Sequence, residues 1–138
     1  MEPADYALQR AVGTVLLAMA GSQPALAQTF PSKPIRIIVG VAAGGNVDLV
    51  ARAIAQPMSE AFSQQVIVDN RPSASSIVGS QLVARAAPDG YTLLAIANTF
   101  ATVPTVIASA GYDPIKEFNG VTLTCLVAQV LEVNPSLP

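Results

Sequence analysis

The chain has 138 residues, of which 51% are hydrophobic and only 12% are charged, and it contains neither histidine nor tryptophan. This length is enough for one modest globular core. A formal net charge of -2 gives no basic footprint of the kind that nucleic-acid binding needs, so we expect no nucleic-acid partner. Without histidine and with a single cysteine, Cys125, the sequence predicts no zinc site and no histidine-based triad. We also expect no cofactor.

The first 27 residues have the pattern of a signal peptide. The apolar run at 11–21 is too short to span a bilayer, and Ala25-Leu26-Ala27 follows it with small residues at the -3 and -1 positions of a cleavage site. The alternative is a buried N-terminal helix. We expect export, with cleavage between Ala27 and Gln28.

A strand and an amphipathic helix are predicted after Pro34. The continuous apolar run at 35–41 is rich in β-branched residues, which is typical of a strand buried on both faces of a parallel sheet. Apolar residues then recur at intervals of three and four over 47–61, as on one side of a helix. Pro57 lies inside this helix and should bend it, because proline donates no backbone hydrogen bond.

The following segments continue this alternation. We predict a strand at 65–70, a helix at 77–87 ended by the turn Pro88-Asp89-Gly90, a strand at 91–98, a helical stretch at 104–110 and one or two further strands within 121–133. Strands and helices that alternate at these spacings form βαβ units with right-handed crossovers. The sequence therefore predicts an α/β fold with an open parallel sheet.

The loop between the first strand and the first helix is a candidate anion-binding site. In open parallel sheets, ligands bind where the carboxyl ends of the strands meet helix N-termini. Gly44-Gly45 allows the backbone to approach a ligand closely, and Asn46 can cap the helix, whose first amides and dipole favour an anion. A tight turn without a ligand is the alternative interpretation of the glycine pair.

Nucleotide-binding motifs match this loop poorly. Gly40 and Gly45 match the outer glycines of a P-loop, but Asn46-Val47 replaces the lysine and the hydroxyl residue that such a loop needs. The adjacent glycines also do not fit G-x-G-x-x-G. Asp69 lies where an acidic residue would hold a ribose, or it caps the turn after its strand. A Rossmann-type NAD-dependent oxidoreductase is therefore one alternative function, and a structural fragment that binds no ligand is another.

Three segments carry a family resemblance: PSKPIRIIVGVAAGGNVDLVARAIAQPMSEAFSQQVIVDNRPSASSIVGSQLVARAAPDGYTLLAIANT, YDPIKEFNGVTL and VLEVNPSLP. They resemble the substrate-binding receptors of tripartite tricarboxylate transporters, the Bug family. The resemblance implies a periplasmic protein of Gram-negative bacteria, not an enzyme, that captures a small carboxylate for membrane permease subunits. It also implies that 28–138 form the N-terminal half-lobe of a type II-like periplasmic binding protein fold, which stops before the second lobe.

The resemblance and the predicted topology together indicate the site residues. In the family, the loop that matches Ala42–Gly45 grips a carboxylate through backbone amides and water. Because the carboxyl ends of parallel strands meet at one edge, we expect 41–46, 71–75 and 98–99 to converge. The candidate ligand-binding residues are Ala42, Ala43, Gly44, Gly45, Asn46, Arg71, Ser73, Ser75, Asn98 and Thr99. Arg71 would either supply charge to the ligand or brace its own turn.

Several positions depart from the family pattern. The family commonly has Thr, Ser or Asn where Val47 stands, so one polar contact is missing. Glycine is usual where Ser63 ends the first helix, and glycines also usually follow the Arg-Pro motif, where this chain has Ser73-Ala74-Ser75-Ser76. Glycine tolerates a positive φ, whereas serine there costs about 1 kcal/mol. We therefore expect backbone strain at these serines.

Overall fold

The computed structural model describes residues 29–127 and 134–136. The predicted signal peptide and its cleavage site lie outside these residues. Every element described below belongs to one unit, Pro31–Pro138. Within the described residues, no helix is both long enough and apolar enough to cross a bilayer.

Strands and helices alternate along this unit as the sequence predicts. They are β1 (Ile35–Val39), α2 (Asn46–Phe62), β2 (Val66–Asn70), the short 3-10 helix η1 (Ala74–Ser76), α3 (Ile77–Ala84), β3 (Thr92–Ala95) and α4 (Thr99–Val106). Each of the three strands lies within its predicted range. The α2 helix is continuous through Pro57.

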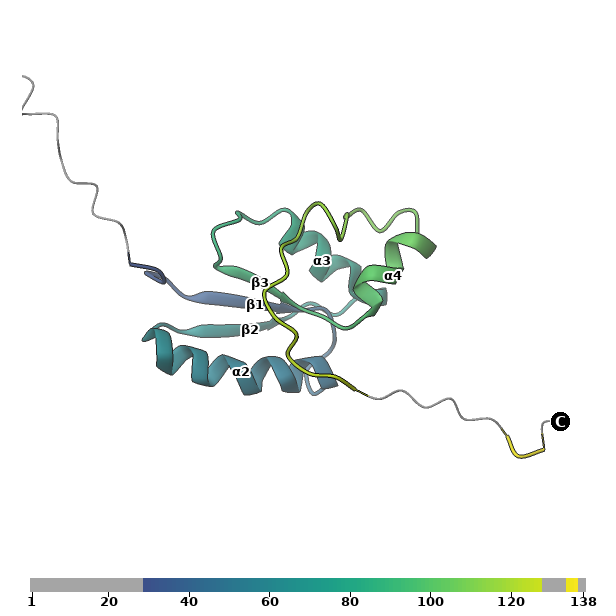
Figure 1. The fold of residues 1–138 in the computed structure, drawn as a ribbon, viewed down its shortest axis with the longest axis horizontal. Helices are drawn as coiled ribbons and strands as arrows, with labels where there is room; N and C mark the ends of the chain where they lie inside the picture. Colours follow the sequence, from purple (N-terminus) through teal and green to yellow (C-terminus); the bar gives the residue numbers. More distant parts are fainter. Residues whose placement is uncertain (1–28, 128–133, 137–138) are drawn as a thin grey trace, which may run out of the picture. The chain divides into compact units, whose positions relative to one another are not determined.

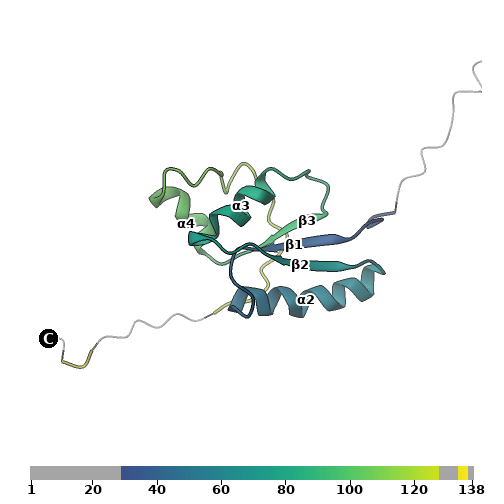
Figure 2. The same ribbon diagram turned by 180° about the vertical axis from the view of Figure 1, so that it is seen from behind.

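The three strands form one parallel sheet in the order β2-β1-β3. In Figures 1 and 2, α2 covers one face of this sheet, and α3 and α4 lie on the other side. The register pairs Val39 at the end of β1 with Asn70 of β2 and with Ala95 of β3. The predicted open parallel α/β sheet is therefore confirmed, and the carboxyl ends of its strands lie together.

The central strand β1 is buried on both faces, which explains its unbroken apolar sequence. Ile37 and Val39 pack against Ala51 and Ala55 of α2. Ile38 has no exposed surface and points to the opposite face, where it lies beside α3. The hydrophobic core thus fixes β1 between two helical layers, and the loop that leaves β1 starts from a rigid base.

The predicted helix at 104–110 is misplaced, because α4 begins at Thr99 and ends at Val106. Pro104 therefore lies inside the helix rather than at its start. A proline at this position cannot donate to the carbonyl four residues earlier, which belongs to Phe100. The hydroxyl of Tyr112 donates to that carbonyl instead, at 3.0 Å, so a contact from a later segment compensates for the missing bond.

The prediction of strands at 121–133 is wrong for residues 121–127, which form no strand, while 128–133 lie outside the described residues. Val121, Leu123, Leu126 and Val127 are all more than 70% exposed. A β-branched sequence alone does not make a strand, because strand formation requires a neighbouring strand to accept its hydrogen bonds. Neither edge of the described sheet pairs with these residues.

The expected strain is confirmed at three of the four serines but not at Ser73, whose φ of -156° is extended. Ser63, Ser75 and Ser76 have φ angles of 50°, 53° and 60°, in the left-handed region that favours glycine. Ser63 is the C-cap of α2, where glycine commonly ends a helix. Each of these three serines costs about 1 kcal/mol of backbone strain relative to glycine.

Candidate functional site

The carboxyl ends of all three strands surround a hollow of about 300 Å³. Its walls come from the β1–α2 junction, from the η1 segment that follows β2, and from the residues that follow β3. The lining residues are Gly40, Val41, Asn46, Val47, Ser73, Ser75, Ser76, Ala95, Ile96, Ala97 and Thr99. The three stretches that the sequence analysis placed at one edge therefore do converge.

Four of the ten candidate residues line the hollow, namely Asn46, Ser73, Ser75 and Thr99. The other six are Ala42, Ala43, Gly44, Gly45, Arg71 and Asn98, and they lie outside its lining. The described walls contain hydroxyl and amide groups beside apolar side chains, and no charged side chain is among them. The hollow therefore offers hydrogen-bond donors but no positive charge.

Among the described residues, the Gly44 and Gly45 amides of the glycine loop have acceptors within the chain, whereas the Ala42 and Ala43 amides have none. The Gly44 amide donates to the Asp48 carboxylate at 2.8 Å, and the Gly45 amide donates to the Ala42 carbonyl at 3.2 Å. Gly45, not Asn46, is the N-cap of α2. The side-chain oxygen of Asn46 instead accepts a hydrogen bond from the Val47 amide. Within the described residues, the Asn46 amide has no acceptor and remains able to bind a ligand.

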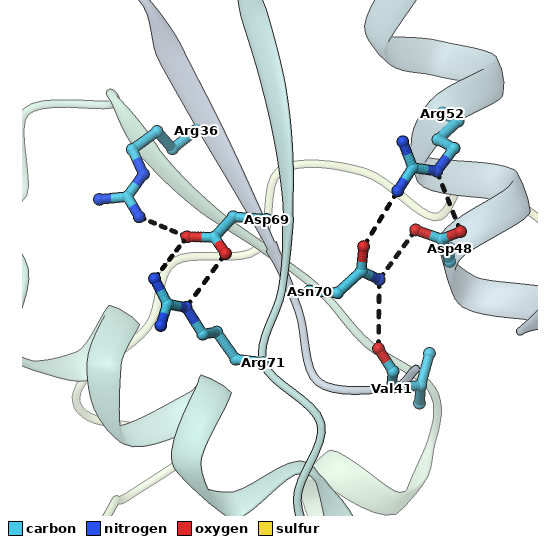
Figure 3. A network of polar contacts seen from close by, with 7 residues as sticks. All are labelled: Arg36, Val41, Asp48, Arg52, Asp69, Asn70 and Arg71. Atoms are coloured by element: carbon cyan, nitrogen blue, oxygen red, sulfur yellow. Dashed lines mark hydrogen bonds and ion pairs between the residues drawn. The ribbon is translucent and has the colours of Figure 1, made fainter. Parts of the chain in front are cut away.

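Asp48 is the polar centre of the loop, and the sequence analysis did not identify it. Its side chain is only 2% exposed. One carboxylate oxygen accepts from Arg52 Nε at 3.0 Å and from the Gly44 amide, and the other accepts from Asn70 Nδ2 at 2.8 Å. Figure 3 shows Arg52 and Asn70 converging on this carboxylate. The hydrogen bond from Arg52, followed by those from Gly44 and Asn70, holds the pKa of Asp48 far below its usual range.

Asn70 connects this carboxylate to the end of β1. Its Nδ2 also donates to the Val41 carbonyl at 3.1 Å, and its Oδ1 accepts from Arg52 Nη2 at 3.0 Å. The side chain of Asn70 therefore satisfies groups on β1 and on α2 while its backbone completes β2 (Figure 3). The sequence did offer one signal for Asp48: it is an acidic residue in the first turn of the helix, and Arg52 follows it by four positions.

Arg71 braces its own turn, which was one of the two alternatives for this residue. Its Nε lies 3.0 Å from Asp69 Oδ1, and Arg36 pairs with the other carboxylate oxygen (Figure 3). Burial raises the pKa of Asp69, but the hydrogen bonds from Arg71 and Arg36 outweigh this effect, so the pKa lies below its usual value. Asp69, the residue considered for a ribose, is thus held between two arginines.

Ser76 and Gly40 lie in close contact in the wall of the hollow. Ser76 is 7% exposed, and its hydroxyl donates to the Gly40 carbonyl at 3.1 Å. A Cβ added at Gly40 would lie 2.3 Å from the Cβ of Ser76. Only glycine at position 40 lets the η1 segment approach the end of β1 this closely.

The chain is similar to a known family of receptors. Residues 50–138 match the family described as tripartite tricarboxylate transporter family receptor. A UPF0065 protein of Bordetella pertussis is 51% identical over 98 residues, which are 71% of this chain and 30% of that protein. Protein BugT of Bordetella pertussis is 34% identical over 130 residues, which are 92% of this chain and 40% of that protein. The chain therefore spans less than half the length of these curated relatives.

Solved structures give the same result. A periplasmic transporter is 44% identical with a TM-score of 0.59, over 63% of this chain and 30% of that chain. Rpa4515 of R. palustris, solved with adipate, is 34% identical with a TM-score of 0.57, over 62% of this chain and 29% of that one. MatC of Rhodopseudomonas palustris, solved with bound malate, is 31% identical with a TM-score of 0.58, over 64% of this chain and 31% of that one. The described fold is thus similar to part of these proteins.

Proposed function

Because the chain belongs to the tripartite tricarboxylate transporter receptor family, we propose that its hollow forms part of the binding site of a periplasmic solute receptor for small carboxylates. The observation that carries this proposal is the convergence of three strand ends on a hollow lined by neutral hydrogen-bond donors. Two structures with a similar fold hold malate and adipate, which are small dicarboxylates. The family consists of receptors rather than enzymes.

The donors of the hollow suit a carboxylate group. The hydroxyls of Ser73, Ser75 and Thr99 and the amide of Asn46 lie in its lining or at the helix start beside it. Hydrogen bonds to a charged acceptor are shorter and stronger than those between neutral groups. Val41, Val47 and Ile96 offer apolar surface for the carbon chain of the ligand. In this arrangement Ala42–Gly45 shape the loop, and Arg71 supports its turn without touching the ligand.

The proposal includes export and delivery to a membrane permease. Residues 1–27 would direct the chain to the periplasm and be removed after Ala27. Expression in a Gram-negative host followed by mass spectrometry of the periplasmic fraction should give a chain that begins at Gln28. A chain that retains Met1 in the cytosolic fraction would contradict this part of the proposal.

Titration with malate and adipate tests the binding site directly. We expect the amide resonances of Asn46, Ser73, Ser75 and Thr99 to shift in nuclear magnetic resonance spectra of the 15N-labelled chain. The affinity should be millimolar or weaker, because exposed hydrogen bonds contribute about 1 kcal/mol each against several kcal/mol of lost ligand motion. The hollow is open enough that Asn46, Ser75 and Thr99 are all exposed.

Two controls make this titration specific. The neutral diamide of malate should shift these resonances less, because its amides do not attract donors as a charged carboxylate does. Thr105→Ala on α4 should leave the titration unchanged, because Thr105 does not line the hollow, whereas Thr99→Ala should weaken it. The proposed site would be contradicted if only other residues shifted, or if no resonance shifted at ligand concentrations well above the millimolar range. Micromolar binding would show that the described hollow suffices without further enclosure.

A further inference from the structure

The loop Val41–Gly45 is held at both ends by two side chains that do not line the hollow. Asn70 donates to the Val41 carbonyl at one end, and Asp48 accepts the Gly44 amide near the other. These two side chains also bond to each other at 2.8 Å. One continuous hydrogen-bonded path therefore runs from the end of β1, through β2, to the start of α2.

Asp48 supplies the negative charge that the N-terminus of α2 favours. A helix N-terminus with free amides attracts anions, and here a carboxylate of the chain itself occupies part of that position. Arg52 balances the charge of Asp48, so the buried carboxylate is fully paired. The Asp48 carboxylate consequently does not need a ligand to be paired, and its contacts can hold the loop in one shape before any ligand binds.

We propose that Asp48 and Asn70 are positioning residues, which fix the Val41–Gly45 loop so that the Asn46 amide faces an incoming ligand while neither side chain contacts that ligand. The inference rests on the proposed binding site at the hollow. A loop that is already ordered loses less conformational freedom on binding, so its donors give more net affinity. Removal of either residue should therefore weaken binding although the donors that touch the ligand remain.

Asn70→Ala tests this role against a matched control. The substitution removes the donors to Val41 and to Asp48, and we expect the Gly44 amide to exchange its hydrogen about five- to tenfold faster. Binding of malate, followed at Asn46, should weaken by a similar factor. Ser59→Ala is the control, because Ser59 Oγ also joins α2 to β2 by accepting from the Val66 amide at 2.9 Å, far from the loop. It should lower the denaturation midpoint without changing Gly44 exchange or the malate titration.

Asn70→Asp adds a pH profile that a general loss of stability would not produce. Two carboxyl groups that share a hydrogen bond cannot both ionise easily, so Asp48 raises the pKa of the new carboxyl group, while Arg52 Nη2, which lies 3.0 Å from the side-chain oxygen of residue 70, opposes this rise. The variant is compared at about pH 5, where more of the new group is protonated, and at about pH 7, where less of it is. When protonated, the new group can still donate to Asp48 and protect the Gly44 amide. We therefore expect the Gly44 amide hydrogen to exchange slowly at the lower pH and fast at the higher pH. The increase should exceed the intrinsic effect of pH on amide exchange, which is measured at Gly120.

The two readouts separate the inference from the proposed function. If the unmodified chain does not bind malate, the proposed function fails, but Gly44 exchange still decides whether Asp48 and Asn70 position the loop. Unchanged Gly44 exchange in Asn70→Ala, or an equal change in Ser59→Ala, would overturn the positioning role. Faster Gly44 exchange with unchanged malate affinity would show that the network orders the loop without supporting binding, which would overturn its link to the site.

Discussion

Gly40→Ala is expected to destabilise the chain by about 3 kcal/mol and to disrupt the hollow. The new methyl group would lie 2.3 Å from Ser76 Cβ, 2.5 Å from Ser76 Oγ and 3.0 Å from Ser76 Cα. Because a backbone atom is among these neighbours, a side-chain rotation cannot relieve the overlap. The η1 segment would have to move away from β1, and it carries Ser75 and Ser76 of the wall. Urea denaturation followed by circular dichroism measures the loss of stability.

Ser76→Gly provides the rescue for this substitution. It removes the two side-chain atoms closest to the new methyl group and places glycine where φ is 60°. The double variant should recover most of the lost stability, giving a coupling energy of about 1–3 kcal/mol in a double-mutant cycle. Gly120→Ala is the matched control, because a Cβ there would meet no atom within 4 Å and the measured stability should not change. If the stability effects of the two substitutions were additive, contact with Ser76 would not be what excludes a side chain at position 40.

Ile38→Ala is expected to cost about 2–5 kcal/mol of stability, the usual effect of truncating a fully buried isoleucine. Ile38 has no exposed surface and lies in the central strand on the face that meets α3. Its Cγ2 is 3.5 Å from the position that a Cβ of Gly79 would take, so the helix packs closely against this side chain. The cavity left by truncation would loosen α3 and with it the η1 segment. Thermal and urea unfolding measure the effect.

Ile115→Ala is the control for this truncation. Ile115 is 86% exposed, so truncation of its side chain to alanine should change the free energy of unfolding by no more than about 0.5 kcal/mol. The difference between the two variants isolates the contribution of burial, because the same atoms are removed. If the two substitutions cost the same, Ile38 would not belong to the core that supports the hollow.

The wall of the hollow combines a strained backbone with close packing. Ser75 and Ser76 have positive φ angles, and Ser76 is nevertheless buried and bonded to Gly40 and, through its carbonyl, to Ser80 Oγ at 3.1 Å. Strained residues persist only where the surroundings hold them in place, and they are common at ligand sites. The contacts of Ser76 provide that support here, so the strain accords with the proposed binding role of this segment.

Local sequence patterns determined the order and type of most elements. The apolar run of β1 is unbroken because that strand is buried on both faces, and the apolar residues of α2 recur at three and four because that helix is buried on one face. Each pattern is visible within a few residues. The alternation of strands and helices determined that the sheet is parallel, because a crossover helix returns the chain in the same direction. Parallel strands in turn brought Asn46, Ser73, Ser75 and Thr99 to one edge.

Contacts between distant residues were decided only by the tertiary structure. The bond of Asn70 to Asp48 spans 22 positions and depends on the register of β2 beside β1, which no local pattern specifies. The Gly44–Asp48 and Gly45–Ala42 bonds decide which amides of the glycine loop remain for a ligand. Likewise, Tyr112 lies 12 positions from Phe100, and its hydroxyl donates to the carbonyl that Pro104 leaves without a helical donor. Residues 121–127 show the converse, because a strand-like sequence forms a strand only where the fold supplies a neighbour.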